Sequence, residues 1–569
     1  MADPIKSVTI VGGGTAGWMA ALILQGYFGD LTKPDARMKI TLIESPNVPT
    51  VGVGEATVPG MPRTLRMAGI SETEFFKTCN ASFKLGVLFS NWNVDQDGKP
   101  IEYVNPFARP PGIGGIEAAQ YFLRYGAGAR DFTQVFSPSV DLANAFKGPR
   151  PLGDKPYAMN VGHAYHLDAG KFAGLMRDIC TARGVRHIRE NVVRVEQDER
   201  GYISALELEQ SGRHPTELII DCTGFKGVII NEVLKEPFVS YSNYLANDRA
   251  MAVQIPHPDP TKIPSLTRSY ALGAGWIWRV PLFNRIGTGY VYSSAHRTDE
   301  EARDEFIAHL GETWNGVEPR VIPMRVGRNR NAWVKNVVAL GLSGGFIEPL
   351  ESTAIHMIDM GVRWLASYFP DSDYAEPLRS RYNKLTGAFY DEVRDFICLH
   401  YALGNRTDSQ YWIDAREGLE VPDRLAENLA LWRHAIPGPY DLETDILFGY
   451  GTYQAVLLGK RVYETGYAVP GFMHNVDLKP DLWAGYLKKL EDTYSKAVPR
   501  MADHHTLLRE LRGDLARPKP KPGFATTQPT VGMPGQPLPK VPVGNPTPAP
   551  AARPKVASDA DDDGSANLL

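Results

Sequence analysis

Three glycines near the N-terminus have the spacing of a loop that binds the phosphates of a dinucleotide. Gly12, Gly14 and Gly17 form the pattern G-x-G-x-x-G between an apolar run at residues 7–11 and a helical pattern at residues 15–28. Gly12 permits a tight turn, Gly14 lets the backbone approach a pyrophosphate, and Gly17 allows close packing of helix on strand. Free N–H groups at the start of the helix face the phosphate charge.

A carboxylate and a second glycine-bearing segment extend this predicted site. Glu44 ends the apolar run at residues 39–44, where a carboxylate accepts hydrogen bonds from an adenosine ribose. Far downstream, residues 221–225 (DCTGF) follow another apolar run and resemble the ATG-type motif of flavoprotein monooxygenases, whose FAD is held by several distant segments. The sequence has no second unit of strand, G-x-G-x-x-G loop and helix to bind a nicotinamide. We therefore predict FAD, with the reduced flavin supplied from elsewhere.

Two tryptophans are predicted to form an aromatic wall at the end of a strand. Side chains alternate faces in an extended strand, so the indoles of Trp276 and Trp278 project from the same side. Pro281 cannot donate to a sheet ladder, so the strand must end there or run along an edge. Coupled to the nucleotide loop, this wall indicates a flavoenzyme pocket.

Composition excludes several classes of partner. The chain has 569 residues, of which 43% are hydrophobic, and its 61 basic and 65 acidic side chains give a net charge of −4. This balance gives no electrostatic reason to expect nucleic acid or an anionic membrane. The four scattered cysteines fit reduced thiols, and the N-terminus lacks the pattern of a signal peptide. With no apolar run of about 18 residues, we predict a soluble cytoplasmic protein without a metal site.

The elements that must position these residues alternate along the chain. Further apolar runs at residues 217–222 and 337–342 are typical of central parallel strands, and antiparallel strands are expected near residues 250–255 and 275–280. The pattern is mainly helical from residue 357 to residue 511. Residues 515–569 are rich in Pro, Gly, Ala and Thr and end in acidic residues, which predicts a disordered tail.

Several collinear motifs resemble the flavin-dependent halogenases of the tryptophan halogenase family. The resemblance covers roughly residues 5 to 500. Beyond the segments above, it is carried by GVGEATVP at 52–59, NASFK at 80–84, GWIWRVP at 275–281, RIGTGYVYSS at 285–294, GRNRNAW at 327–333, FIEPLESTA at 346–354 and RDFICLHY at 394–401. The family's WxWxIP motif is present with Val280 in place of isoleucine.

The resemblance implies an α/β fold with an FAD-binding, Rossmann-like domain of the flavoprotein monooxygenase type, an antiparallel sheet and a mostly helical substrate-binding region. We expect a module at residues 1–356 with inserted substrate-region segments at 84–165 and 235–330. A helical region at 357–514 and the tail at 515–569 follow.

It also implies the chemistry. In this family, reduced FAD, dioxygen and halide give hypohalous acid, which travels to a separate chamber that binds the aromatic substrate. Lys84 matches the family lysine, which holds the halogen by hydrogen bonding or captures it as a haloamine. Glu351 matches the family glutamate, which stabilises the cationic ring intermediate and accepts its proton. Glu348 in the same EPLE segment is the competing candidate, and His400 in LHY is interpreted as structural.

Further site residues follow from matching positions. Thr353 and Ala354 are predicted to bind chloride or bromide through backbone N–H groups, although many members have glycine at the position of Ala354. Trp276 and Trp278 are predicted to wall the substrate off from the flavin. The predicted cofactor-binding residues are Gly12, Gly14, Thr15, Ala16, Gly17, Glu44, Val192, Leu342, Ser352 and Ile355.

The substrate region departs from members that act on free tryptophan. Those members carry His-x-Phe, whereas this chain has Asn105 and Phe107, which keeps the phenyl ring and loses the imidazole. The Tyr pair and Glu that grip the amino and carboxyl groups of tryptophan have no counterpart, and Phe448 stands near the position of a stacking tryptophan. A polar site selects its substrate by pairing its own polar groups with those of the substrate. Because this chain lacks the groups that would bind the amino and carboxyl groups of tryptophan, we predict an electron-rich, indole-like arene rather than free tryptophan.

Two alternatives stay open, and one partner is required. The protein could instead be a flavin-dependent monooxygenase that hydroxylates an arene, or a flavin-binding protein without enzymatic activity. A halogenase of this kind needs a separate NAD(P)H-dependent flavin reductase. A two-fold homodimer is expected only because such assemblies are common.

Overall fold

The computed structural model describes residues 3–48, 54–465 and 476–516. Contacts divide the chain into the units Met1–Thr526 and Thr527–Leu569, and the second unit lies outside the described residues. The predicted disordered tail therefore falls almost wholly outside them, as do the first residues of the GVGEATVP motif. The boundary predicted at residues 356 and 357 stays a prediction.

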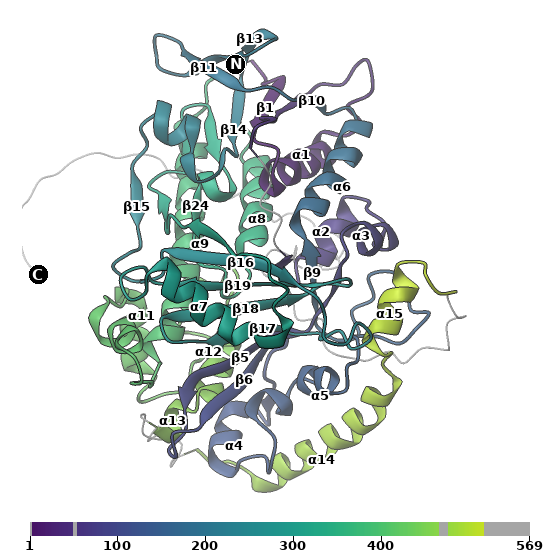
Figure 1. The fold of residues 1–569 in the computed structure, drawn as a ribbon, viewed down its shortest axis with the longest axis vertical. Helices are drawn as coiled ribbons and strands as arrows, with labels where there is room; N and C mark the ends of the chain where they lie inside the picture. The colour runs from purple at the N-terminus through teal and green to yellow at the C-terminus, as the bar shows by residue number, and fades with distance from the viewer. Residues whose placement is uncertain (1–2, 49–53, 466–475, 517–569) are drawn as a thin grey trace, which may run out of the picture. The chain divides into compact units, whose positions relative to one another are not determined.

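A six-stranded sheet carries the N-terminal glycine loop (Figure 1). Its order is β10-β2-β1-β14-β23-β22, and all neighbours are parallel except β22 with β23. The strands are short and mostly buried, as expected for a parallel sheet covered on both faces. They are β1 (Ser7–Val11), β2 (Lys39–Ile43), β10 (Arg186–Ile188), β14 (Leu218–Asp221), β22 (Trp333–Val334) and β23 (Val337–Ala339).

A seven-stranded sheet joins the two segments that were predicted as insertions. Its order is β20-β16-β19-β18-β17-β5-β6, and only β17 and β5 pair in parallel. Its strands are β5 (Gly86–Val94), β6 (Pro100–Pro106), β16 (Arg249–Ile255), β17 (Thr267–Ala271), β18 (Gly275–Pro281), β19 (Ile286–Tyr292) and β20 (Arg320–Pro323). Strand β18 ends at Pro281, as its missing N–H requires.

Four smaller sheets complete the strands of the described chain. The most important for the site has the order β3-β9-β4, with β3 (Gly54–Ala56), β9 (Ala164–Asp168) and β4 (Ser82–Lys84). The others are β11 (Val192–Gln197) with β12 (Ile203–Leu208) and β13 (Gly212–Pro215); β15 (Phe238–Ser240) with β21 (Gly327–Asn329) and β24 (Gly345–Phe346); and β7 (Gly112–Ile113) with β8 (Ile116–Glu117).

Helices pack on the six-stranded sheet and build most of the C-terminal half. Helix α1 (Thr15–Phe28) contacts α6 (Ala169–Ala182) and α8 (Ala354–Ser367), and α8 in turn contacts the long α9 (Glu376–Ala402). The other helices are α2 (Met61–Met67), α3 (Glu72–Thr78), α4 (Ala118–Tyr125), α5 (Ser139–Asn144), α7 (Asp299–Leu310), α10 (Gln410–Ile413), α11 (Asp423–Leu431), α12 (Tyr450–Gly459), α13 (Val462–Thr465), α14 (Pro480–Ala497) and α15 (His504–Leu511).

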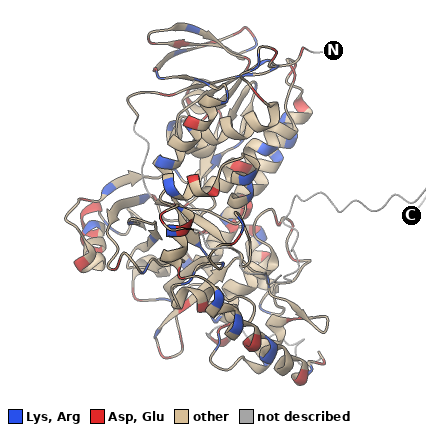
Figure 2. Cartoon of the chain, turned by 90° about the vertical axis from the view of Figure 1, so that its right-hand side faces the viewer, with Lys and Arg blue, Asp and Glu red and all other residues tan. Residues whose placement is uncertain are grey.

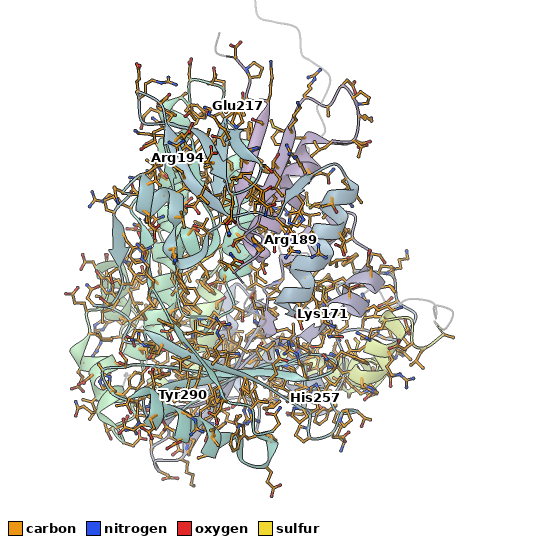
Figure 3. The ribbon with its side chains drawn as sticks, turned by 45° about the horizontal axis from the view of Figure 1, so that its top comes forward. Lys171, Arg189, Arg194, Glu217, His257 and Tyr290 are labelled. Atoms are coloured by element: carbon orange, nitrogen blue, oxygen red, sulfur yellow. The ribbon has the colours of Figure 1, made fainter. Side chains whose placement is uncertain are left out.

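Charges of both signs are interspersed over the face shown in Figure 2. Figure 3 marks Lys171 on α6, Glu217 just before β14, and Tyr290 on β19.

None of the helices described is both long enough and apolar enough to cross a bilayer.

Candidate active site

A cavity of about 1080 Å³ runs from the glycine loop to the aromatic strand β18. Many predicted residues line it together: Gly12, Gly14, Thr15, Ala16, Glu44, Val192, Trp276, Trp278, Leu342, Ser352, Thr353, Ala354 and Ile355. This volume is at the upper end of the roughly 300–1,000 Å³ range for ligand sites. The structure thus brings the cofactor and halide positions into one space.

The three glycines of the predicted phosphate-binding loop have different surroundings. Gly12 has φ +120°, and a Cβ there would lie 2.2 Å from the carbonyl oxygen of Cys222. Gly17 does not line the cavity, because it faces the loop, where a Cβ would lie 1.9 Å from the carbonyl oxygen of Gly12. Gly14 has no heavy atom within 4 Å of a built Cβ and opens into the cavity. Only Gly14 therefore leaves room for an approaching phosphate.

Glu44 lies directly over this loop. A Cβ at Gly13 would lie 2.3 Å from the Glu44 side chain, and Oε2 of Glu44 lies 2.9 Å from Nε2 of His187. The carboxylate is therefore held at the cavity wall before any ribose is bound.

The residues predicted to bind halide stand at a helix start. Thr353 is the N-cap of α8 and Ala354 its first residue, and the first N–H groups of a helix have no partner within the helix. Ser352 just before them has φ +61°, a conformation that costs a non-glycine residue roughly 1–2 kcal/mol. Leu350 and Ser352 line the cavity, whereas Glu351 does not.

Lys84 ends β4 and its side chain is completely buried. Its Nζ donates to the carbonyl oxygen of Thr57 at 3.1 Å and lies 5.4 Å from the centre of the Phe107 ring. Burial lowers the pKa of Lys84 to about 7, and the negative charge of Glu351 opposes this shift. Lys84 and Glu351 therefore lie close enough for their charges to interact.

Glu351 is buried, and two groups lie close to one of its carboxylate oxygens. Nδ2 of Asn105 donates to Oε1 at 3.0 Å. Nε2 of His400 lies 3.3 Å from the same oxygen. Burial lowers the pKa of His400. Asn105 near the end of β6 and Phe107 just after the strand thus link the carboxylate to the lysine.

The competing carboxylate, Glu348, has different surroundings. Its Oε2 accepts hydrogen bonds from Nε1 of Trp276 at 2.7 Å, Nδ2 of Asn247 at 2.9 Å and the hydroxyl of Tyr401 at 2.8 Å. Burial raises the pKa of Glu348. These contacts fix the indole of Trp276, which packs against Trp278 with ring centres 6.3 Å apart. Both indoles face the cavity, as their alternation in the strand predicts.

Phe448 belongs to the helical side of this region. Its ring stacks on Phe396 at 3.9 Å, and the Phe396 ring meets His400 edge-on at 5.2 Å. Two rings therefore separate Phe448 from Glu351, and its role in binding substrate stays a prediction.

The sequence argument did not assign His400 and Tyr103 to the site. The hydroxyl of Tyr103 lies 3.2 Å from Nδ1 of His400, so the imidazole stands between a tyrosine and Glu351. Tyr103 is two residues before Asn105 on β6, and in a strand such residues share one face. This spacing in the sequence could have indicated that Tyr103 lies at the site with Asn105.

Comparisons with known proteins show the family of this chain. The model of the tryptophan halogenase family matches residues 7–470. The chain belongs to this family. Tryptophan 6-halogenase SttH from Streptomyces toxytricini is 37% identical over 478 residues, covering 79% of this chain and 88% of that protein.

Solved structures of the family agree in fold. A tryptophan halogenase from Shewanella frigidimarina has a TM-score of 0.83 at 34% identity, covering 90% of this chain and 98% of that one. BrvH, a flavin-dependent halogenase from Brevundimonas sp. BAL3, has a TM-score of 0.78 at 35% identity, covering 89% and 99%. The protein is thus a flavin-dependent halogenase, an oxidoreductase, and the predicted α/β fold class is confirmed.

The lining of the cavity fits FAD, the cofactor of this halogenase family. Gly14 and the start of α1 can receive the pyrophosphate, and Glu44 the ribose. In the described part of the chain, no three or more His, Cys, Asp or Glu residues are grouped so that they could hold a metal ion.

Two alanine substitutions in the glycine loop should separate packing from cofactor binding. Gly17→Ala forces a methyl group against the Gly12 carbonyl, so we expect a loss of about 1–3 kcal/mol in the free energy of unfolding. Gly14→Ala projects into open cavity, so the melting temperature of the apoprotein should be retained while FAD binds at least tenfold more weakly. Calorimetry and flavin titration measure the two effects. Equal losses of stability in both variants would contradict this division.

A matched pair of asparagine variants should test the prediction that Glu351, and not Glu348, is the catalytic base. Asn105→Leu removes the donor from Glu351, and Asn247→Leu removes one donor from Glu348. A lost hydrogen bond to a buried charge costs about 1.5–3 kcal/mol, so we expect Asn105→Leu to lower kcat roughly 10- to 100-fold with FAD affinity retained. Asn247→Leu should change kcat far less, because Glu348 keeps Trp276 and Tyr401. The reverse order of effects would identify Glu348.

Proposed function

We propose that this halogenase uses FADH2 from a separate NAD(P)H-dependent flavin reductase to convert chloride or bromide to hypohalous acid. We propose further that it halogenates an electron-rich, indole-like arene other than free tryptophan by electrophilic substitution. The observation that carries the proposal is that Lys84 and Glu351 are both buried and contact residues two positions apart, Lys84 the ring of Phe107 and Glu351 the amide of Asn105.

Lys84 is suited to present the halogen to the arene. One N–H of its ammonium group is used by the carbonyl of Thr57, which leaves two donors for the oxidant. The Phe107 ring beside Nζ excludes water and favours the cationic form. A dry environment strengthens every hydrogen bond that the lysine makes to the reacting group.

Glu351 is suited to the second half of the substitution. When the halogen adds to the ring, positive charge develops there, and a buried carboxylate nearby stabilises it. The same oxygen atoms can then take the ring proton. The hydrogen bond from Asn105 fixes one oxygen and leaves the other free for this transfer.

Asn105 also supports the proposed substrate class. In the tryptophan-specific pattern the corresponding imidazole contacts the aromatic substrate, whereas here the amide is engaged with Glu351. The phenyl ring of Phe107 remains half-buried next to Lys84. With no Tyr pair and Glu to bind an amino acid's charges, recognition rests on the arene itself. SttH, by contrast, is named a tryptophan 6-halogenase.

Removing the lysine should stop halogenation without disturbing the flavin. We expect Lys84→Met to lose at least 1,000-fold in product formation while binding FAD and consuming dioxygen normally. Product is measured by mass spectrometry and peroxide release by a coupled assay. Halogenation at more than a tenth of the native rate would reject the assignment of Lys84.

The pH profile should report the charge state of this lysine. Burial lowers its pKa to about 7, so the ammonium form dominates below that pH and the free amine above it. If the ammonium group holds the oxidant by hydrogen bonding, single-turnover halogenation falls as pH rises through about 7. This limb should be missing from Lys84→Met. A rate that instead rises through this range would identify the free amine, and hence haloamine formation.

A direct assay should establish both reaction and substrate class. With FADH2, bromide and indole under air, we expect the paired masses of a monobrominated product, because bromine has two abundant isotopes. Free tryptophan should give at least tenfold less product under the same conditions. A single added oxygen would indicate hydroxylation, and preferential bromination of tryptophan would overturn the substrate proposal.

A further inference from the structure

We infer that Arg325 is an anion-binding entrance through which halide reaches the cofactor cavity. Arg325 lines the cavity of about 1080 Å³ and also a neighbouring cavity of about 390 Å³. Met324 is the other residue that both cavities share. The side chain therefore stands where the two spaces meet, and the inference rests on the halogenase function proposed above.

The guanidinium group of Arg325 is held in place without being neutralised. Nη1 donates to the carbonyl oxygen of Phe225 at 3.1 Å and to Oδ1 of Asn231 at 3.0 Å. The group lies over the ring of Phe238, with Cζ 3.7 Å from its centre. Within the described residues no carboxylate forms an ion pair with it. A fixed, half-buried cation with free donors is what binds a passing anion.

Three basic side chains line the large cavity. Lys226, Arg320 and Arg325 come from the segments at residues 223–226 and 320–325, which meet where Arg325 binds Phe225. Three carboxylates also line this cavity. Glu44 is engaged with His187, Glu190 accepts from the backbone of Gln210 and Ser211, and burial raises the pKa of Glu55 to about 7. In the smaller cavity, Asp248 is engaged with Arg249 and Ser294. Because none of the described carboxylates pairs with Arg325, its positive charge favours an anion nearby.

The small cavity supplies the surroundings that a halide needs. Its wall includes the serines Ser240, Ser242, Ser293 and Ser294 beside apolar residues. The hydroxyls of Ser240 and Ser294 already donate to Ser242 and Asp248, whereas the hydroxyl of Ser242 can turn toward an anion. Arg325 and the predicted halide residues Thr353 and Ala354 line the same large cavity. Phe225, whose carbonyl oxygen Arg325 binds, also lines it and packs edge-on against Phe346 with ring centres 5.5 Å apart.

Iodide quenching of bound flavin tests this without depending on turnover. Iodide quenches the fluorescence of oxidised FAD by contact, and neutral acrylamide reports access without charge. For Arg325→Gln we expect the iodide quenching constant to fall about three- to tenfold, because a steering charge is lost, with acrylamide quenching unchanged. Arg325→Lys should retain most of the native value, and the KM for bromide should rise in parallel in Arg325→Gln.

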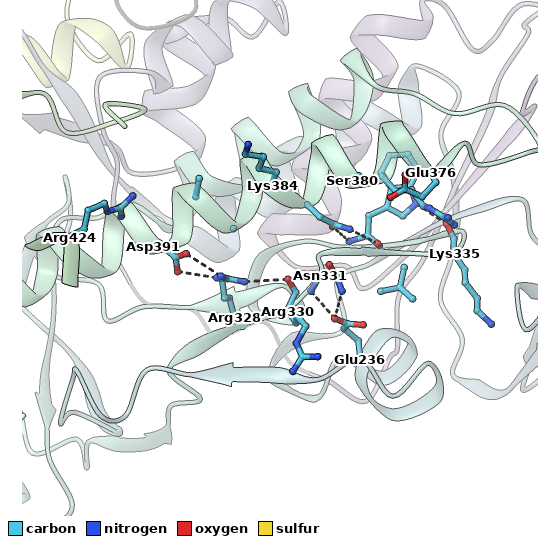
Figure 4. Close-up of a pocket in the computed structure, with 16 residues that line it drawn as sticks. Glu236, Arg328, Arg330, Asn331, Lys335, Glu376, Ser380, Lys384, Asp391 and Arg424 are labelled. Atoms are coloured by element: carbon cyan, nitrogen blue, oxygen red, sulfur yellow. Dashed lines mark hydrogen bonds and ion pairs between the residues drawn. The ribbon is translucent and has the colours of Figure 1, made fainter. Parts of the chain in front are cut away.

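Lys384→Gln is the matched control. Lys384 is an exposed cation on α9 in a separate pocket, lined also by Arg328, Arg330 and Glu376 (Figure 4). Lys384→Gln removes one positive charge, as Arg325→Gln does, so an effect of net charge alone would appear equally in both variants. We expect no change in iodide quenching for Lys384→Gln. Equal effects in the two variants would overturn the proposal.

Two further results would also overturn it. If Arg325→Gln weakens FAD binding tenfold while iodide access persists, Arg325 serves the cofactor phosphates instead. If crystals of the native protein soaked in bromide show no anomalous peak within about 4 Å of the guanidinium, Arg325 does not bind halide. The native crystal also decides the case where Arg325→Gln does not fold. Anion binding with no halogenated product would leave this inference intact and refute the proposed function.

Discussion

The structure depends on burying two opposite charges that lie far apart in the sequence. Lys84 and Glu351 are both removed from water, and the desolvation of each is costly unless partners compensate it. The compensation comes from three neighbours: the carbonyl of Thr57 accepts from Lys84, Asn105 donates to Glu351, and the Phe107 ring lies beside the ammonium group. Asn105 in β6 and Phe107 just after it supply two of the three, so the position of β6 affects both members of the pair.

The two sheets contribute different parts of the wall of the cofactor cavity. The six-stranded sheet presents the glycine loop and Glu44 to the cofactor cavity, and β18 supplies its indole wall. The turn at Ser352 places Leu350 and Ser352 on the cavity, whereas Glu351 does not line it and accepts a hydrogen bond from Asn105. A residue in a strained conformation thus stands between the cavity wall and the buried carboxylate, and such strain is common at functional sites.

Glu348 explains why a second carboxylate stands three residues away. Its hydrogen bonds to Trp276, Asn247 and Tyr401 tie β18 to α9 and hold the indole in one orientation. A buried carboxyl group without these donors would be destabilising. Its contacts therefore give it a structural role that Glu351, with fewer fixed donors, does not have.

The sequence by itself determined the elements whose signals are local. β1, α1 and the end of β18 at Pro281 were predicted from apolar runs, glycine spacing and a missing N–H, and the motifs identified the family. Tertiary structure alone decided that β5 pairs in parallel with β17, that His400 lies beside Glu351, and that Arg325 joins two cavities. Asn105 and Glu351 are 246 positions apart, and no local pattern encodes such a contact. It follows only from the way distant strands pair and helices pack against them.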